Sequence, residues 1–129
     1  MAKYISVEEE LTKSSYFISN FLIREGYHVD FTLNSFEEID SFISEKLSLL
    51  LENENSKNYI FSLSAYIGEV LKISFKGKWN VINDIDFNNH ATVSFKNGSS
   101  INPFDLTFDV LQKKYTLQYF LNNIFSIKN

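Results

Sequence analysis

Residues 62–79, SLSAYIGEVLKISFKGKW, place a glycine and a glutamate inside an apolar segment and end on the single tryptophan of this 129-residue chain. Apolar residues recur at helical spacing through most of this stretch and just before it, so we expect a helix over about residues 57–73. Ser64 and Gly68 lie four residues apart, and their small size predicts a notch that admits a neighbouring backbone. After Gly77 the pattern becomes extended. The segment therefore predicts the junction between the helices and the sheet of an α+β domain.

Two helices are predicted before this segment. Ser6-Val7-Glu8-Glu9 has the pattern of a capping box, which predicts a helix over residues 7–25 that ends at Gly26. Ser35-Phe36-Glu37-Glu38 repeats the pattern and predicts a second helix, followed by a polar loop at residues 52–56. Between them, residues 29–33 alternate in polarity, which fits an extended connector or a brief strand.

The second half of the chain predicts a small antiparallel sheet and two further helices. Residues 78–82 resemble a strand, residues 91–96 alternate, and Asn97-Gly98 is the dipeptide favoured in a type I′ hairpin turn. Asn102 can cap a helix that begins at Pro103. A last helix is expected over residues 117–127. We therefore predict one domain over residues 1–129, with helices packed on a small antiparallel sheet.

Composition narrows the classes of function. With 44% hydrophobic and 16% aromatic residues, the chain carries enough apolar side chains to form a core. The net charge is −4, and Arg24 is the single arginine, so the bidentate side chains that favour nucleic acid are almost missing. We expect no nucleic-acid partner. An acidic surface instead suits a basic protein, although this charge is also ordinary for a cytosolic domain.

Several kinds of chemistry are excluded or unsupported. The chain has no cysteine, which excludes disulfides, thiolate catalysis and cysteine-bound zinc. It contains neither the glycine-rich loops that hold nucleotides nor the turn that presents a catalytic serine, so we expect no cofactor and no enzyme activity. The amino end, MAKYISVEEELTK, becomes acidic before any signal-like apolar run, and no stretch has the length of a membrane span. We expect a cytoplasmic protein without a membrane partner.

Two sets of residues offer alternatives that involve chemistry. Asp84, Asp86 and His90 could hold a divalent ion, although an asparagine-rich solvated loop explains them more simply. Glu69 lies at the edge of an apolar helix face, where burial would raise the pKa of its carboxyl group and suit it to acid–base work. Its structural alternative is a bond to a lysine or to the Trp79 indole. A small metal-dependent hydrolase or nuclease is therefore the second hypothesis.

Aromatic and acidic side chains instead indicate contact with another protein. Tyrosines and phenylalanines exceed the needs of one apolar stripe per helix, and tyrosine is common at interface hot spots. A tyrosine-rimmed core is the competing interpretation, and a homo-oligomeric scaffold such as a homodimer is the third hypothesis. The candidate partner-binding residues are five acidic residues and one tyrosine: Glu52, Glu54, Tyr66, Glu69, Asp84 and Asp86.

The run FTLNSFEEIDSFI, then AYIGEV, then a tryptophan after a glycine, then a short hairpin and INPF, resembles a group of small uncharacterised bacterial proteins. The resemblance covers roughly residues 29–112. Some members lie among bacterial toxin and immunity systems, so the resemblance implies an immunity-type or accessory protein in the cytoplasm. It implies no catalytic residues. The leading hypothesis is a protein that neutralises a bacterial toxin domain by direct binding.

Overall fold

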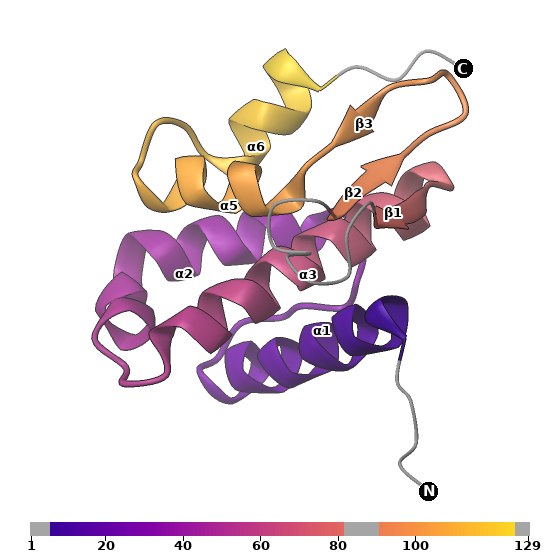
Figure 1. Cartoon of the computed structure of the whole chain (residues 1–129). Helices are drawn as coiled ribbons and strands as arrows, with labels where there is room; N and C mark the ends of the chain where they lie inside the picture. Colours follow the sequence, from indigo (N-terminus) through magenta and orange to yellow (C-terminus); the bar gives the residue numbers. More distant parts are fainter. Residues whose placement is uncertain (1–5, 82–90, 126–129) are drawn as a thin grey trace, which may run out of the picture.

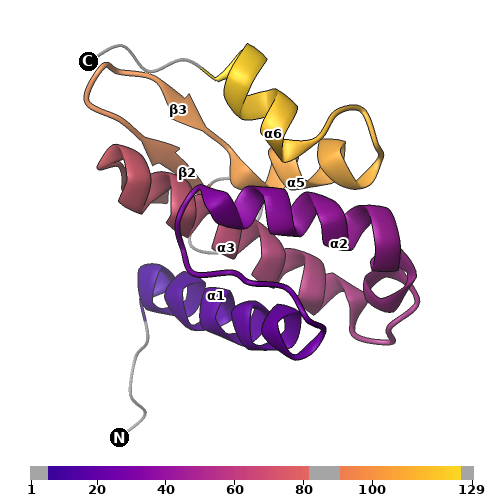
Figure 2. The same cartoon turned by 180° about the vertical axis from the view of Figure 1, so that it is seen from behind.

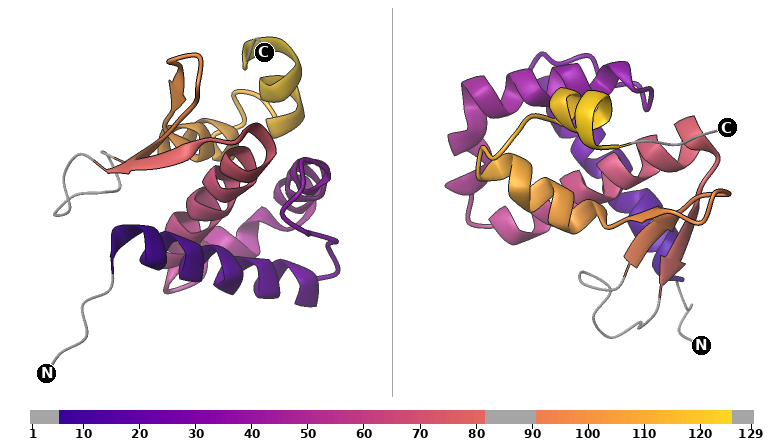
Figure 3. Two further views of the ribbon diagram at one scale, coloured as in Figure 1. Left: turned by 90° about the vertical axis from the view of Figure 1, so that its right-hand side faces the viewer. Right: turned by 90° about the horizontal axis from the view of Figure 1, so that it is seen from above.

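A computed structural model describes residues 6–81 and 91–125. Its central element is α3 (Ser56–Phe75), which contacts α1 (Val7–Arg24) on one side and α5 (Pro103–Leu111) on another. α2 (Asn34–Leu51) lies behind α3 in Figure 1 and in front of it in Figure 2. The strands project from the carboxyl end of α3 (Figure 3). This is the single α+β domain that the sequence predicted.

Both ends of α1 are set by local sequence, as predicted. The Ser6 hydroxyl oxygen accepts a hydrogen bond from the Glu9 backbone N–H at 3.1 Å, which caps the first turn. At the other end Gly26 has φ +99°, a conformation that glycine adopts without steric cost. The N–H groups of Gly26 and Tyr27 donate to the carbonyls of Ile23 and Leu22, both at 3.0 Å. These two bonds form a Schellman motif and end the helix.

The predicted capping box of α2 is wrong. The helix begins at Asn34, after Leu33, and Leu33 has no side-chain capping bond. Ser35 lies inside the first turn, fully buried, and bonds to Asp30 and Tyr66 instead. The segment before it is a connector with bends rather than a strand, and Phe31 has φ +65°. Tertiary hydrogen bonds thus occupy the side chain of Ser35, which the local sequence had assigned to the helix cap.

The predicted notch on α3 is present at Gly68, but side chains fill it rather than the neighbouring backbone that was expected. Gly68 faces the Trp79 indole and the Pro103 ring, so that a Cβ atom added to it would lie 2.6 Å from Trp79 Cζ2 and 2.9 Å from Pro103 Cγ. Such distances are well below ordinary carbon–carbon contact. A glycine is therefore required here by close packing, and it connects α3 to the first strand and to α5.

Within the described residues the sheet has three antiparallel strands in the order β1 (Lys78–Val81), β2 (Ala91–Ser94) and β3 (Ser100–Ile101). Trp79 pairs with Val93, and Val93 pairs with Ile101. The predicted type I′ turn at Asn97-Gly98 is wrong, because only Gly98 of the turn has positive φ, at +88°. Phe95 accepts from the Gly98 N–H, and its own N–H donates to Ser99 O. These bonds define a three-residue loop with a glycine bulge.

The carboxyl-terminal helices pack across α2. Asn102 caps α5 by accepting from the N–H groups of Phe104 and Asp105, with Pro103 in the first position, as predicted. The last helix begins at Leu117, also as predicted, but it is a short α-helix, α6 (Leu117–Tyr119), continued by a π-helix, η1 (Phe120–Ile124). Figure 3 shows this segment over α2 when the molecule is seen from above. Residues 126–127 of the predicted helix lie outside the described residues.

The core lies between α3 and the elements around it. Its largest fully buried side chains come from α1, α2, α3 and α6: Tyr66, Phe36, Phe42, Leu11, Ile18, Leu22, Ile39, Leu50, Leu63, Ile67, Leu71 and Leu117. Apolar burial of this extent supplies most of the favourable free energy of folding. None of the helices in the described parts of the chain combines the length and the apolar content needed to span a bilayer.

Candidate protein-contact site

Glu69 is buried, and its carboxylate is bonded to groups within the fold. Its side chain is 5% exposed, its Oε2 accepts from Trp79 Nε1 at 2.5 Å, and the same oxygen lies 3.1 Å from Lys72 Nζ. A buried carboxylate with an N–H donor and an ammonium partner is satisfied within the fold. These are the tryptophan and lysine partners of the structural alternative. Glu69 fixes the Trp79 indole against Gly68, and it is not on a surface that a partner contacts.

Tyr66 is likewise withdrawn from the surface, which corrects its assignment as a partner-binding residue. Its side chain is fully buried. Its hydroxyl accepts from the Phe31 N–H at 2.8 Å and donates to Ser35 Oγ at 2.9 Å. Ser35 also bonds to Asp30, so one buried hydroxyl ties α3 to the connector between α1 and α2. Burial raises the pKa of Tyr66, which keeps the hydroxyl protonated as this network requires.

The proposed metal-binding set cannot be placed. Asp84, Asp86 and His90 lie outside the described residues. In the rest of the chain, over residues 6–81 and 91–125, no group of three or more histidine, cysteine, aspartate or glutamate side chains is arranged to hold a metal ion. His28, the other histidine, is exposed on the connector before α2.

Glu52 and Glu54 are exposed, as a partner-binding role requires, and they lie in the turn between α2 and α3. Two large apolar side chains lie beside them in sequence. Leu49 is 43% exposed and Leu51 is 48% exposed. We call Leu49, Leu51, Glu52 and Glu54 the α2-end surface. Leu49 and Leu51 are two residues apart on a helix and point to different sides, so the end of α2 exposes both apolar side chains and carboxylates.

The α2-end surface follows a kink in α2. Lys46 has φ −137° and ψ 26°, outside helical values. Its Nζ donates to the Glu25 carbonyl at 3.0 Å, lies 3.5 Å from Glu25 Oε1 and sits 5.5 Å from the centroid of the Tyr27 ring. Lys46 thus ties the middle of α2 to the end of α1. The last turn of α2 changes direction at this tether.

Tyr27 completes the tether. Its hydroxyl donates to Glu45 Oε1 at 2.6 Å, and its ring packs edge-on against Phe42. The bond to Glu45, followed by burial, raises the pKa of Tyr27 to about 12. Glu45 and Lys46 are therefore held on both sides of the kink by residues from the end of α1.

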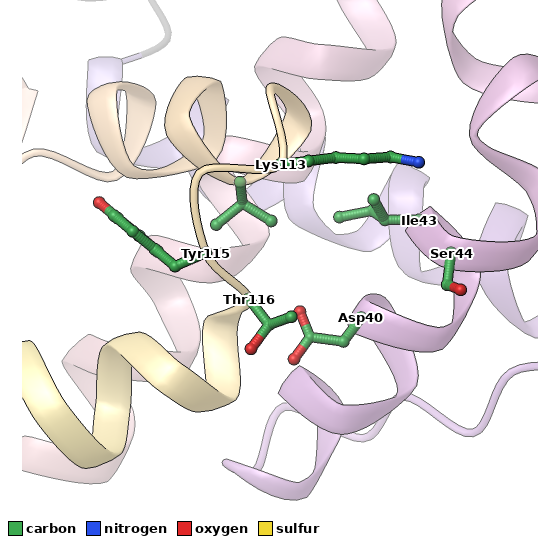
Figure 4. A pocket seen from close by; sticks show the side chains of 7 residues that line it. Asp40, Ile43, Ser44, Lys113, Tyr115 and Thr116 are labelled. Atoms are coloured by element: carbon green, nitrogen blue, oxygen red, sulfur yellow. The ribbon is translucent and has the colours of Figure 1, made fainter.

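A cleft of about 220 Å³ lies between α2 and the connection from α5 to α6 (Figure 4). Ile43 and Val110 form apolar walls, and Asp40, Ser44, Lys113 and Thr116 supply polar groups. The Asp40 carboxylate is already engaged, because it accepts from the N–H groups of Leu117 at 2.8 Å and Gln118 at 3.0 Å. Burial raises the pKa of Asp40 despite these two bonds. The cleft is smaller than ordinary ligand pockets, and its carboxylate caps α6.

Aromatic side chains form a second apolar surface across α1, α3 and α5. Phe17 is 44% exposed and Phe108 is 58% exposed, with Phe61 and Phe104 half-buried between them. Two shallow hollows of about 470 and 330 Å³ meet at Phe61. Two further aromatic residues, Tyr16 and Tyr119, are 58% and 52% exposed. The chain thus has more aromatic side chains than its core buries, and some of them are exposed.

No protein-family model, curated protein or solved structure matches this chain. The resemblance to small bacterial proteins therefore remains a prediction. The function has to be argued from the contacts, charges and exposure of the chain's own residues.

Sequence reasoning missed the two leucines. Leu49 and Leu51 continue the apolar pattern of α2, which places residues of this type on a buried face. Both leucines follow the kink at Lys46, whose side chain is bonded to Glu25 and lies over the Tyr27 ring. A local signal was nevertheless present, because Leu49, Leu50 and Leu51 are consecutive and a helix cannot bury three successive side chains on one stripe.

Proposed function

We propose that this protein binds another protein through the α2-end surface and that it acts as an immunity-type protein, neutralising a bacterial toxin domain by covering it. The observation that carries the proposal is the exposure of Leu49 and Leu51 beside Glu52 and Glu54. Exposed leucines supply contact area, and carboxylates select a basic partner surface. This combination favours binding over chemistry.

The tether to α1 supports the same proposal. Interfaces bind more tightly when their side chains are already fixed in the free protein, because less conformational freedom is lost on association. Lys46, Tyr27 and Glu25 hold the kink before the last turn of α2 through a hydrogen bond, an ion pair and a ring contact. The α2-end surface is therefore presented by a fixed support.

The alternative function, a metal-dependent hydrolase, needs Glu69 to be available for acid–base chemistry. Glu69 was to act as its general acid or base, yet that carboxylate is bonded to Trp79 and paired with Lys72. A general base must be able to reach substrate. We therefore do not propose an enzymatic function.

The test is a capture experiment with matched variants. Tagged parent protein, a Leu49→Lys/Glu54→Lys variant and a Phe108→Lys variant are incubated with a lysate of the source cells, and retained proteins are identified by mass spectrometry. The proposal expects one stoichiometric partner that the parent and Phe108→Lys retain and the α2-end variant loses. Expressed alone, that partner should arrest growth, and co-expression of the parent should restore it. A partner that is harmless, or that the α2-end variant binds equally well, would contradict the proposal.

A further inference from the structure

The two ends of α3 differ in charge. Glu52 and Glu54 precede the helix, whereas Lys76 and Lys78 follow it. A helix of 20 residues is about 30 Å long, so these groups are separated by most of the molecule. Figure 1 shows the α2–α3 turn and the strands at opposite ends of α3.

Close packing at Gly77 brings three lysines together at the carboxyl end of α3. A Cβ atom added to Gly77 would lie 2.8 Å from Val93 Cγ1 and 2.9 Å from Phe95 Cδ1, so the junction of α3 with β1 rests directly on the end of β2. Lys76 and Lys78 flank this glycine, and Lys96 directly follows Phe95. All three lysines are exposed.

An exposed apolar side chain accompanies these lysines. Ile73 is 55% exposed and lies in the last turn of α3, just before Lys76. We call Ile73, Lys76, Lys78 and Lys96 the lysine end. Glu69, the carboxylate of α3, is paired with Lys72, and over residues 6–81 and 91–125 no ion pair involves Lys76, Lys78 or Lys96. Lys76 also has φ +56°, a conformation that favours glycine.

The lysine end and the α2-end surface are complementary. One carries Lys76, Lys78, Lys96 and an exposed isoleucine, and the other carries Glu52, Glu54 and two exposed leucines. We propose that the α2-end surface of one copy binds the lysine end of a second copy. The contact is head-to-tail, so successive copies either close into a ring or extend into a chain.

The charges determine which surfaces meet, and the apolar side chains supply most of the attraction. Exposed ion pairs contribute little individually and are screened by salt, so the association is reversible and weakens as salt is added. This inference does not rest on the proposed function. A basic partner that occupies the α2-end surface would compete with the second copy.

The first turn of α1 is another exposed acidic region, with Glu8, Glu9 and Glu10. It is a poorer contact for the lysine end. Carboxylates in a first turn already interact favourably with the positive end of the helix dipole. The adjacent apolar residues, Val7 and Leu11, are not exposed, so this turn offers charge without apolar area.

Sedimentation equilibrium of the full chain tests the proposal. At low salt, the average mass of the parent should rise above 15.0 kDa as its concentration increases, and the rise should be smaller in 1 M salt, where the Debye length is about 3 Å. Two charge-reversed variants, Glu52→Lys/Glu54→Lys and Lys78→Glu/Lys96→Glu, should each remain monomeric. An equimolar mixture of the two should associate, because each supplies the charge that the other lacks.

A matched control distinguishes this contact from a general effect of net charge. Glu8→Lys/Glu9→Lys makes the same change in charge as the α2-end variant and should associate as the parent does, once circular dichroism has shown that it is folded. The proposal is overturned if the parent stays monomeric at low salt, if the mixture stays monomeric, or if the α1 control loses association.

Discussion

Replacing Gly68 with alanine should destabilise the domain, even though alanine is the better helix former. The substitution gains about 1 kcal/mol of helix propensity. Against this, the new methyl group would lie 2.6 Å from Trp79 Cζ2 and 2.9 Å from Pro103 Cγ. Overpacking of this kind costs about 1–3 kcal/mol. The indole cannot shift freely, because Glu69 holds its Nε1 at 2.5 Å.

The expected net loss, overpacking less the gain in helix propensity, is up to about 2 kcal/mol of unfolding free energy for Gly68→Ala and more for Gly68→Leu, whose larger side chain must displace the indole. Urea unfolding followed by the fluorescence of Trp79 measures the loss, since Trp79 is the single tryptophan. The comparison for Gly68→Leu is read by circular dichroism as well, because the indole itself is disturbed.

A double-mutant cycle gives the decisive comparison, with all its variants followed by circular dichroism because Trp79→Phe removes the single tryptophan. Trp79→Phe removes the part of the indole that a Cβ at position 68 would meet, so Gly68→Ala should cost less in that background than in the parent. Gly68→Ala unfolding at the same urea concentration as the parent, or at a higher one, would refute the close-packing argument. Equal costs in the two backgrounds would show that Trp79 is not the neighbour that matters.

Three further predictions concern groups held within the fold. Lys113→Gly should stabilise the domain by about 1 kcal/mol in urea unfolding, because Lys113 has φ +62° at the end of α5, and Lys114→Gly should not. Tyr66→Phe should lower the unfolding free energy by about 1–3 kcal/mol through loss of the buried bonds to Phe31 and Ser35, and an unchanged value would contradict that network. Burial raises the pKa of Asp40 above its unfolded value, so the folded protein binds that proton more tightly and the contribution of Asp40 to stability falls as pH rises from about 4 towards neutral. Unfolding at a series of pH values should show this slope in the difference between parent and Asp40→Asn, and a slope of opposite sign would disprove it.

Features governed by neighbouring residues could be predicted from the sequence. The cap at Ser6, the stop at Gly26 and the start of α5 at Asn102-Pro103 depend on residues within one turn of the helix end. The notch at Gly68 was also predictable, because a glycine inside an apolar helical pattern needs a packing reason. Its partners were not, since Trp79 and Pro103 come from two other elements.

Features that depend on distant residues were missed for that reason. Ser35 had the sequence of a cap, but Tyr66 and Asp30 bind its hydroxyl, and the helix begins one residue earlier. Asn97-Gly98 had the sequence of a two-residue turn, yet the bonds of Phe95 to Gly98 and Ser99 set a longer loop. In both cases local preference favours one geometry by about 1 kcal/mol, which tertiary contacts readily exceed.

The positions of the buried polar side chains allow stability and the proposed binding to be tested separately. Glu69 and Tyr66, which the sequence suggested as contact residues, fix α3 to β1 and to the connector before α2. Their substitution should therefore change stability first. Glu52, Glu54, Leu49 and Leu51 make no such connections in the described structure and lie beyond the tether at Lys46. Exposed positions of this kind usually change unfolding free energy by less than about 0.5 kcal/mol when substituted. Loss of binding by the α2-end variants with unchanged unfolding would consequently report on the surface itself, whereas loss of both would mean that the last turn of α2 supports the core.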